Sequence, residues 1–256
     1  MLQQEKRGRG LIASRVFTIA LIGADGAGKS TIARRIEEAF PLPLKYLYMG
    51  VNPFSSNFAL PTTRLAEFVK RKLGKDKRDL QNSSPDRQRS GKEKPKWMRN
   101  LKAAVRIACL LPEEWYRQLI SWSYQMRGYC VLYDRHFAVD FEPSRTESET
   151  RYVPLADRLH RWLLGKFYPR PDLVIFLDAP PEVLYARKGE GSLSYLRARR
   201  DAFLDQGKRL RHFFIVDASL PLGTVCDLVF QKIFRFYETR TGRPLLTGLT
   251  VEELNK

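Results

Sequence analysis

Short apolar runs alternate with segments of helical spacing along most of the chain. The first run, residues 16–22, is almost continuously apolar, as expected for a strand that is buried on both faces of a sheet. The predicted strands are residues 16–22, 45–49, 130–133, 173–177 and 213–216. Strands that alternate with helices in this way predict an α/β fold, with a five-stranded parallel sheet and helices on both faces.

Proline bounds or interrupts two of the predicted helices. The segment 31–40 has helical spacing and stops at Pro41, because proline lacks the N–H group that a helix requires. The long segment 101–127 contains Pro112, where we expect the helix to break. The other predicted helices are residues 64–73, 155–167, 182–187, 195–210 and 222–239.

Between the first predicted strand and the first predicted helix, the sequence fits the phosphate-binding loop pattern G-x-x-x-x-G-K-[ST]. Its glycines let several backbone N–H groups point at one anion, and the following helix adds its positive end. Lys29 can reach the β- and γ-phosphates, and the Ser30 hydroxyl can ligate magnesium. We therefore predict a nucleoside triphosphate site. It comprises Gly23, Asp25, Gly26, Ala27, Gly28, Lys29, Ser30 and Thr31.

Three aspartates, Asp134, Asp178 and Asp217, follow predicted strands at the edge where parallel sheets bind ligands. A carboxylate at Asp134 can orient a magnesium ion or accept a proton from an attacking oxygen. The adjacent Arg135 offers a planar fork that suits an acceptor phosphate. The alternative is a charged, solvated turn, but the nearby phosphate loop favours a catalytic role for both residues. His136 fits packing as well as catalysis.

Several segments resemble the thymidylate kinase family. The loop from Gly23 to Thr31, GADGAGKST, is similar to its phosphate loop, and Asp134-Arg135 is similar to the Asp-Arg motif that ends its third strand. Further similar stretches are residues 171–183, 195–210 and 217–218. The resemblance implies a P-loop NTPase fold, the use of ATP and Mg²⁺, and phosphoryl transfer in a closed cleft. It implies dTMP as the default acceptor. The predicted metal-binding residues are Ser30, from the phosphate loop, and Asp134, from the end of the third predicted strand.

The basic, glycine-flanked segment 187–192 corresponds to the lid region of that family. Phosphoryl transfer develops negative charge that fixed cations stabilise, and a mobile lid supplies them while it excludes water. We assign a catalytic role to Arg187 and a nucleotide-binding role to Arg200. The alternative is that these arginines merely solvate exposed helices. For Asp178 we weigh a structural role in the turn after the fourth strand against a place near the magnesium.

The acceptor half departs from the family's pattern. Residues 49–56, MGVNPFSS, stand where the family carries an acidic Glu-Pro-Gly-Gly-type loop, and a basic insertion at 70–102 follows the second strand. A kinase of the same fold that acts on a nucleoside, sugar or other metabolite therefore stays open. A GTPase is excluded by the absence of an Asn-Lys-x-Asp-type motif. A motor ATPase is disfavoured because the fourth strand does not end in an acid pair.

The net charge of +17 suits phosphorylated ligands, nucleic acid or an anionic surface. A solvated surface insertion is favoured over a nucleic-acid site, because no aromatic ladder interleaves the charges of 70–102. We expect a basic extension at 1–15, a single kinase domain at 16–239 and a weakly ordered tail at 240–256. Three widely spaced cysteines and the absence of a membrane-length apolar run favour a cytoplasmic protein. A homodimer is compatible with the sequence.

Overall fold

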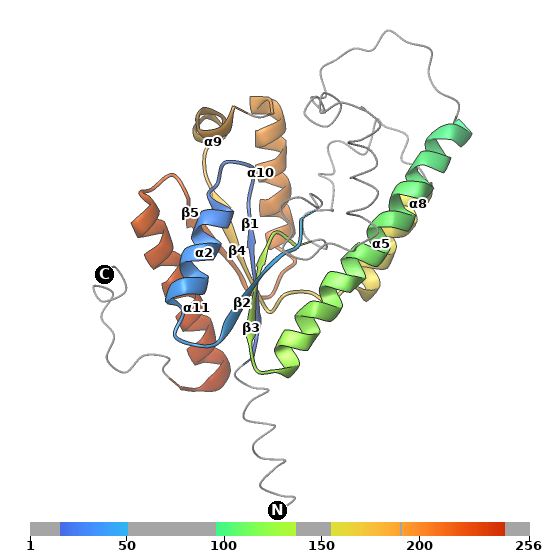
Figure 1. Ribbon diagram of the computed structural model, residues 1–256. Coiled ribbons are helices and arrows are strands. Elements are labelled where there is room, and N and C mark those ends of the chain that lie inside the picture. Colours follow the sequence, from blue (N-terminus) through green and yellow to red (C-terminus); the bar gives the residue numbers. More distant parts are fainter. Residues whose placement is uncertain (1–15, 51–95, 137–154, 190, 244–256) are drawn as a thin grey trace, which may run out of the picture.

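Five parallel strands form the central sheet in the order β2-β3-β1-β4-β5 (Figure 1). They are β1 (Thr18–Ile22), β2 (Leu44–Tyr48), β3 (Cys130–Asp134), β4 (Leu173–Asp178) and β5 (Phe213–Asp217). Each lies within two residues of its predicted bounds, so the predicted parallel sheet is confirmed. Because β1 pairs with both β3 and β4, the carboxyl ends of these three strands meet at one edge.

The computed structural model describes residues 16–50, 96–136, 155–189 and 191–243. The helices of these ranges are α2 (Lys29–Ala39), α5 (Lys96–Met126), α8 (Leu155–Phe167), α9 (Pro181–Lys188), α10 (Leu193–Gly207) and α11 (Leu222–Thr241). Most of them follow a strand and return the chain to the start of the next strand, which parallel pairing requires.

Successive residues of β1 point to opposite faces of the sheet and so divide the core in two. Ile19 and Leu21 pack on the side covered by α2 and α11. Ala20 and Ile22 pack on the other side, with side chains from α8 and α10. The prediction of helices on both faces is therefore confirmed, and it explains why the strand is apolar at consecutive positions.

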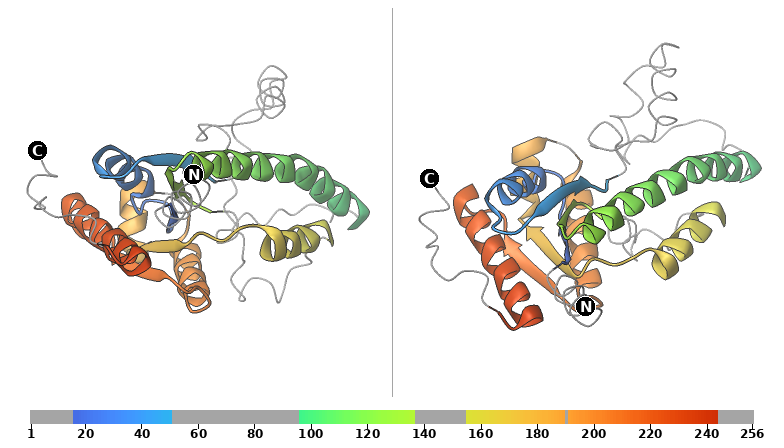
Figure 2. Two further views of the ribbon diagram at one scale, coloured as in Figure 1. Left: turned by 90° about the horizontal axis from the view of Figure 1, so that it is seen from below. Right: turned by 60° about the horizontal axis from the view of Figure 1, so that its bottom comes forward.

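Helices α5 and α8 pack against each other and project together from one side of the sheet (Figure 2). The predicted break at Pro112 is wrong, since α5 continues through this residue. A proline removes one helical hydrogen bond, and packing of α5 against α8, β2 and β3 offsets this loss.

The structure also corrects two predicted boundaries. Helix α5 begins at Lys96, so the last residues of the predicted insertion 70–102 are helical. Helix α11 extends to Thr241, and Arg240 binds Asp172 through Nη1 and Oδ1 at 2.8 Å, so the predicted tail begins later than 240.

Other predicted segments lie outside the described residues. They are the extension 1–15, the helix 64–73, the rest of the insertion and the chain beyond 243. Within the part of the chain that is described, no helix is long and apolar enough to cross a membrane.

Candidate active site

The loop between β1 and α2 follows a backbone path that favours glycine at three positions, of which Gly26 and Gly28 bear most on the site. Gly28 caps α2 with a φ of 81°, and Gly26 has a φ of 90°. A Cβ atom on Gly26 would lie 2.9 Å from the carbonyl oxygen of Leu184, so α9 packs directly behind the loop. The path brings the positive N-terminal end of α2 to the place predicted for the phosphates.

Lys29 lies inside the curve of this loop. Its Nζ donates hydrogen bonds to the carbonyl oxygens of Gly23 and Ala24, at 3.0 and 2.8 Å. The side chain is buried, and the two carbonyls replace the water that its charge would otherwise require. The loop therefore holds a fixed positive charge where the sequence predicts the donor phosphates.

Asp134 is fully buried at the end of β3. Its Oδ2 accepts hydrogen bonds from the hydroxyls of Ser30 (2.5 Å) and Tyr46 (2.9 Å). Its Oδ1 is buried and has no hydrogen-bond partner within the described ranges. Leaving a buried carboxylate oxygen unpaired is costly, and a divalent cation would remove the cost. The hydroxyl of Ser30 and the carboxylate of Asp134 therefore form a donor set that fits magnesium.

Tyr46 is a residue of this site that the sequence reasoning missed. Tyr48 pairs with Asp134 across β2 and β3, so Tyr46 is the diagonal neighbour of Asp134 on the same face. Burial and the nearby carboxylate of Asp134 raise the pKa of the Tyr46 phenol, which keeps its proton and remains a donor. Sequence alone offers no signal for the contact, because it depends on which strand lies beside β2.

Arg135 reaches from the end of β3 across to the phosphate loop. Its φ of 69° lies in the left-handed region, which is unusual for a residue with a side chain and is common at functional sites. Its Nη2 donates to Oδ1 of Asp25, and Nζ of Lys188 on α9 lies 4.0 Å from the same oxygen.

The charge of Asp25 is set by opposing effects. Burial raises the pKa of this carboxyl, but the positive charges of Arg135 and Lys29 outweigh burial and hold it below 3.8. Asp25 therefore stays ionised and ties the loop to Arg135, so the structure brings together the predicted residues of the loop and of the Asp-Arg pair.

Arg187 and Arg200, the two arginines predicted to act on the nucleotide, both contact other parts of the protein. Arg200 forms a two-point contact with Asp178, from Nε to Oδ1 at 2.6 Å and from Nη2 to Oδ2 at 2.7 Å. Arg187 donates through Nη1 to the carbonyl oxygen of Ala218 at 2.7 Å, after β5. Asp178 therefore has a structural contact, which links the end of β4 to α10. The roles of both arginines toward a nucleotide stay predictions.

His136 is buried among aromatic rings. Its ring centroid lies 5.2 Å from that of Tyr133 and 5.5 Å from that of Tyr168. Burial lowers the pKa of His136 to about 3, so the imidazole is neutral at physiological pH. Of the two roles weighed for this histidine, the structure favours packing.

Buried polar groups on α5 form a further cluster that the sequence did not reveal. Arg117 donates through Nη1 to the carbonyl oxygen of Gly50 at 2.6 Å and through Nη2 to Glu113 at 2.8 Å. Glu114, which follows Glu113 on the same helix, forms a hydrogen bond between its Oε2 and Nε2 of His160 on α8, at 2.9 Å. These contacts fix α5 against α8 and against the chain that leaves β2 toward the predicted acceptor side.

The parallel sheet, the phosphate loop and the buried aspartate beside the loop define a P-loop kinase, an enzyme that transfers a phosphoryl group from a bound nucleotide. The resemblance to the thymidylate kinase family is confirmed by a curated relative, the probable thymidylate kinase of Archaeoglobus fulgidus. The two chains are 27% identical over 225 residues, which cover 85% of this chain and 95% of the relative. No family model matches the chain.

Solved structures of deoxyadenosine kinase from M. mycoides are also similar to this chain. The structure with bound dCTP aligns with a TM-score of 0.46 at 18% identity and covers 84% of this chain and 98% of its own. The structure with the products dCMP and a flexible dCDP aligns with a TM-score of 0.47 at 16% identity and covers 84% and 97%.

Proposed function

We propose that the protein transfers the γ-phosphate of ATP to a nucleoside monophosphate, with dTMP as the first acceptor to test. The observation that carries the proposal is the meeting of Lys29, Ser30 and Asp134 at one edge of the sheet, with Arg135 beside them. Similarity to the probable thymidylate kinase along most of the chain supports the same reaction class.

The donor side follows from the loop. The backbone N–H groups of residues 23–31 and the ammonium of Lys29 hold the β- and γ-phosphates. The Ser30 hydroxyl and the Asp134 carboxylate would hold Mg²⁺, and the bound ion would neutralise charge on the transferring phosphate. In this role Asp134 also orients the hydroxyl of Ser30 through Oδ2.

The acceptor side rests on the arginines. Arg135 directs its guanidinium toward the acceptor phosphate, while Asp25 keeps the side chain over the loop. Arg187 exchanges the carbonyl of Ala218 for the transferring group when the site closes, and Arg200 steadies the donor nucleotide.

One observation favours a second candidate, a kinase of the same fold whose acceptor is a nucleoside or another metabolite. The fork of Arg135 is engaged by the carboxylate of Asp25, and the chain after β2 lacks the acidic loop of the family. An acceptor without a phosphate does not need the guanidinium of Arg135 to be available for binding. Binding of nucleic acid is a third reading, which rests on net charge alone.

The test is ADP production from Mg²⁺ and ATP across a panel of acceptors that includes dTMP, the other nucleoside monophosphates, nucleosides and sugars. Lys29→Ala is the blank, because it removes the fixed charge of the loop and should abolish nearly all turnover. Circular dichroism and thermal unfolding verify that the variant is folded. Turnover with monophosphates supports the proposal, whereas turnover with nucleosides or sugars alone selects the second candidate. Full activity of folded Lys29→Ala contradicts both.

We also propose that the chain forms a homodimer through an apolar face of α5 and α8. The exposed large apolar side chains of these two helices, which make up the proposed α5/α8 apolar face, are Leu119, Trp122, Met126, Leu155, Leu159, Trp162 and Phe167. Together they expose roughly 800 Å², close to what one partner contributes to a standard interface.

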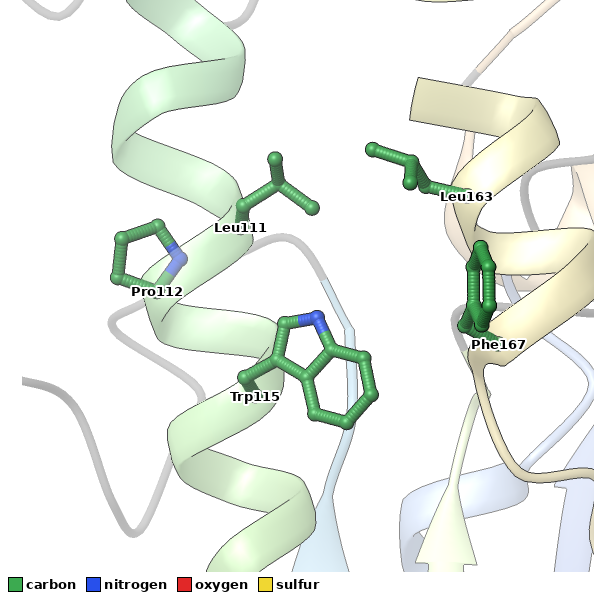
Figure 3. A pocket seen from close by; sticks show the side chains of 5 residues that line it. All are labelled: Leu111, Pro112, Trp115, Leu163 and Phe167. Carbon is green, nitrogen blue, oxygen red and sulfur yellow. The ribbon is translucent and has the colours of Figure 1, made fainter. Parts of the chain in front are cut away.

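Aromatic rings pair on both helices of the α5/α8 apolar face. The rings of Trp162 and Phe167 lie 5.7 Å apart, and those of Trp115 and Trp122 lie 6.2 Å apart. An apolar cavity of about 270 Å³ lies between the two helices, and one ring of each pair, Trp115 and Phe167, lines it (Figure 3). Its lining is Leu111, Pro112, Trp115, Leu163 and Phe167. A second copy that packs on this face would cover the cavity and the exposed rings.

Sedimentation equilibrium at micromolar concentration tests the dimer. We expect the wild-type chain to have twice the monomer mass, and Leu159→Glu to be monomeric because it places a charge in the α5/α8 apolar face. Leu220→Glu, at an exposed position after β5, is the matched control and should remain dimeric. A monomeric wild-type chain, or a dimer that survives Leu159→Glu unchanged, would remove the proposal.

A further inference from the structure

Tyr46 lies between α2 and β3 in a fixed position. Its backbone N–H donates to Oε1 of Glu37 on α2 at 3.0 Å, and its ring packs against the core on the α2 side of the sheet. The strand register directs its side chain diagonally to Asp134, where the phenol donates to Oδ2 at 2.9 Å. The contact therefore follows from the backbone and does not require a flexible loop.

Two hydroxyls share one oxygen of the Asp134 carboxylate. The torsion that turns a carboxylate about its Cβ–Cγ bond is broad, so a single hydrogen bond leaves considerable freedom. The donors from Ser30 and Tyr46 come from α2 and β2, and together they hold Oδ2 between these elements. The other oxygen, Oδ1, remains buried without a partner in the part of the chain that the structure describes.

We propose that Tyr46 is a positioning residue, which orients the Asp134 carboxylate so that its bare oxygen serves the divalent cation of the bound nucleotide. The proposal rests on the proposed function, since it assigns the cation to Ser30 and Asp134. In this role Tyr46 acts through the Asp134 carboxylate. The Ser30 hydroxyl donates its hydrogen bond to Oδ2 beside that of Tyr46, and the oxygen of Ser30 keeps a lone pair for the cation.

The test compares Tyr46→Phe with the wild-type chain, using Mn²⁺ and ADP as probes and electron paramagnetic resonance to measure bound Mn²⁺. Phenylalanine keeps the ring against the core and removes only the donor. We expect the affinity for Mn²⁺ in the presence of ADP to fall about tenfold, as when groups that support metal ligands are removed. The affinity for ADP without metal should not change. Tyr129→Phe is the matched control. Tyr129 directly precedes the first residue of β3, at the other end of the strand from Asp134, and the variant should bind Mn²⁺ as the wild type does.

A double-mutant cycle with Asp134→Asn shows whether Tyr46 acts through the carboxylate. In the Asp134→Asn background, Tyr46→Phe should have little further effect on Mn²⁺ affinity, because the group that it positions is already altered. Equal effects in both backgrounds, or unchanged Mn²⁺ affinity in Tyr46→Phe alone, overturn the proposal. An equal loss of affinity for metal-free ADP also overturns it, because that loss indicates a general structural role.

The readout separates this inference from the proposed function. If no acceptor supports turnover but Tyr46→Phe weakens Mn²⁺ binding as expected, the proposed reaction fails and the positioning role stands. If turnover is found and Mn²⁺ binding is unchanged in Tyr46→Phe, the reaction stands and the positioning role fails.

Discussion

Replacing Gly26 by alanine tests the backbone path of the phosphate loop. The φ of 90° costs a residue with a side chain about 1–2 kcal/mol. The new Cβ would lie 2.9 Å from the carbonyl oxygen of Leu184, and relieving this contact requires a backbone shift that costs roughly 1–3 kcal/mol. We therefore expect the free energy of unfolding to fall by about 2–5 kcal/mol and the thermal midpoint to fall by roughly 4–20 °C.

Urea unfolding and nucleotide binding measure the two consequences. Because the shift separates the loop from α9, Gly26→Ala should also weaken binding of ATP. Gly165→Ala is the matched control. Among the described residues, no atom outside its own stretch of helix lies within 4 Å of the added methyl group, and alanine favours the helix by up to about 1 kcal/mol. The reasoning is refuted if Gly26→Ala is as stable as Gly165→Ala and binds ATP as the wild type does.

Two further predictions concern charged contacts at the site. Arg200→Ala and Asp178→Asn should each lower stability by about 1 kcal/mol in urea unfolding, as expected for a partly exposed pair. Of the two variants, only Arg200→Ala should raise the KM for ATP. Equal KM values for Arg200→Ala and Asp178→Asn would limit Arg200 to a structural role. Asp25 has a lowered pKa, so its contribution to stability is present above pH 3.8 and is lost as the pH falls through the folded pKa. The difference in thermal midpoint between the wild type and Asp25→Asn should therefore shrink from pH 6 to pH 3, and a constant difference would contradict this assignment.

The strands and the loop could be predicted because their signals are local. Apolar runs such as 173–177 are short and end at polar residues, which leaves little choice of element or boundary. The residues of the loop are consecutive, so their proximity to one another follows directly from the sequence. The contact between Ser30 and Asp134 was anticipated at the level of the sheet edge, because parallel strands bring their carboxyl ends together.

The contacts that were missed depend on tertiary neighbours. Tyr46 reaches Asp134 because β2 lies beside β3 in a particular register, and neither the strand order nor the register was predicted. An arginine such as Arg117 would ordinarily be assigned to the solvent-exposed surface. It is buried because Glu113 and carbonyl oxygens at and just after the end of β2 accept hydrogen bonds from its guanidinium. At Pro112 a local rule predicted a break, and packing of the neighbouring turns overrides it.

Transfer of ³²P from [γ-³²P]ATP to an added acceptor tests the central claim most directly. With Mg²⁺ and dTMP present, the account predicts a labelled nucleoside diphosphate on thin-layer chromatography, and no such product with Lys29→Ala. Label that appears as inorganic phosphate regardless of the acceptor, or no release of label by a folded protein that binds ATP, would contradict the assignment as a nucleotide kinase.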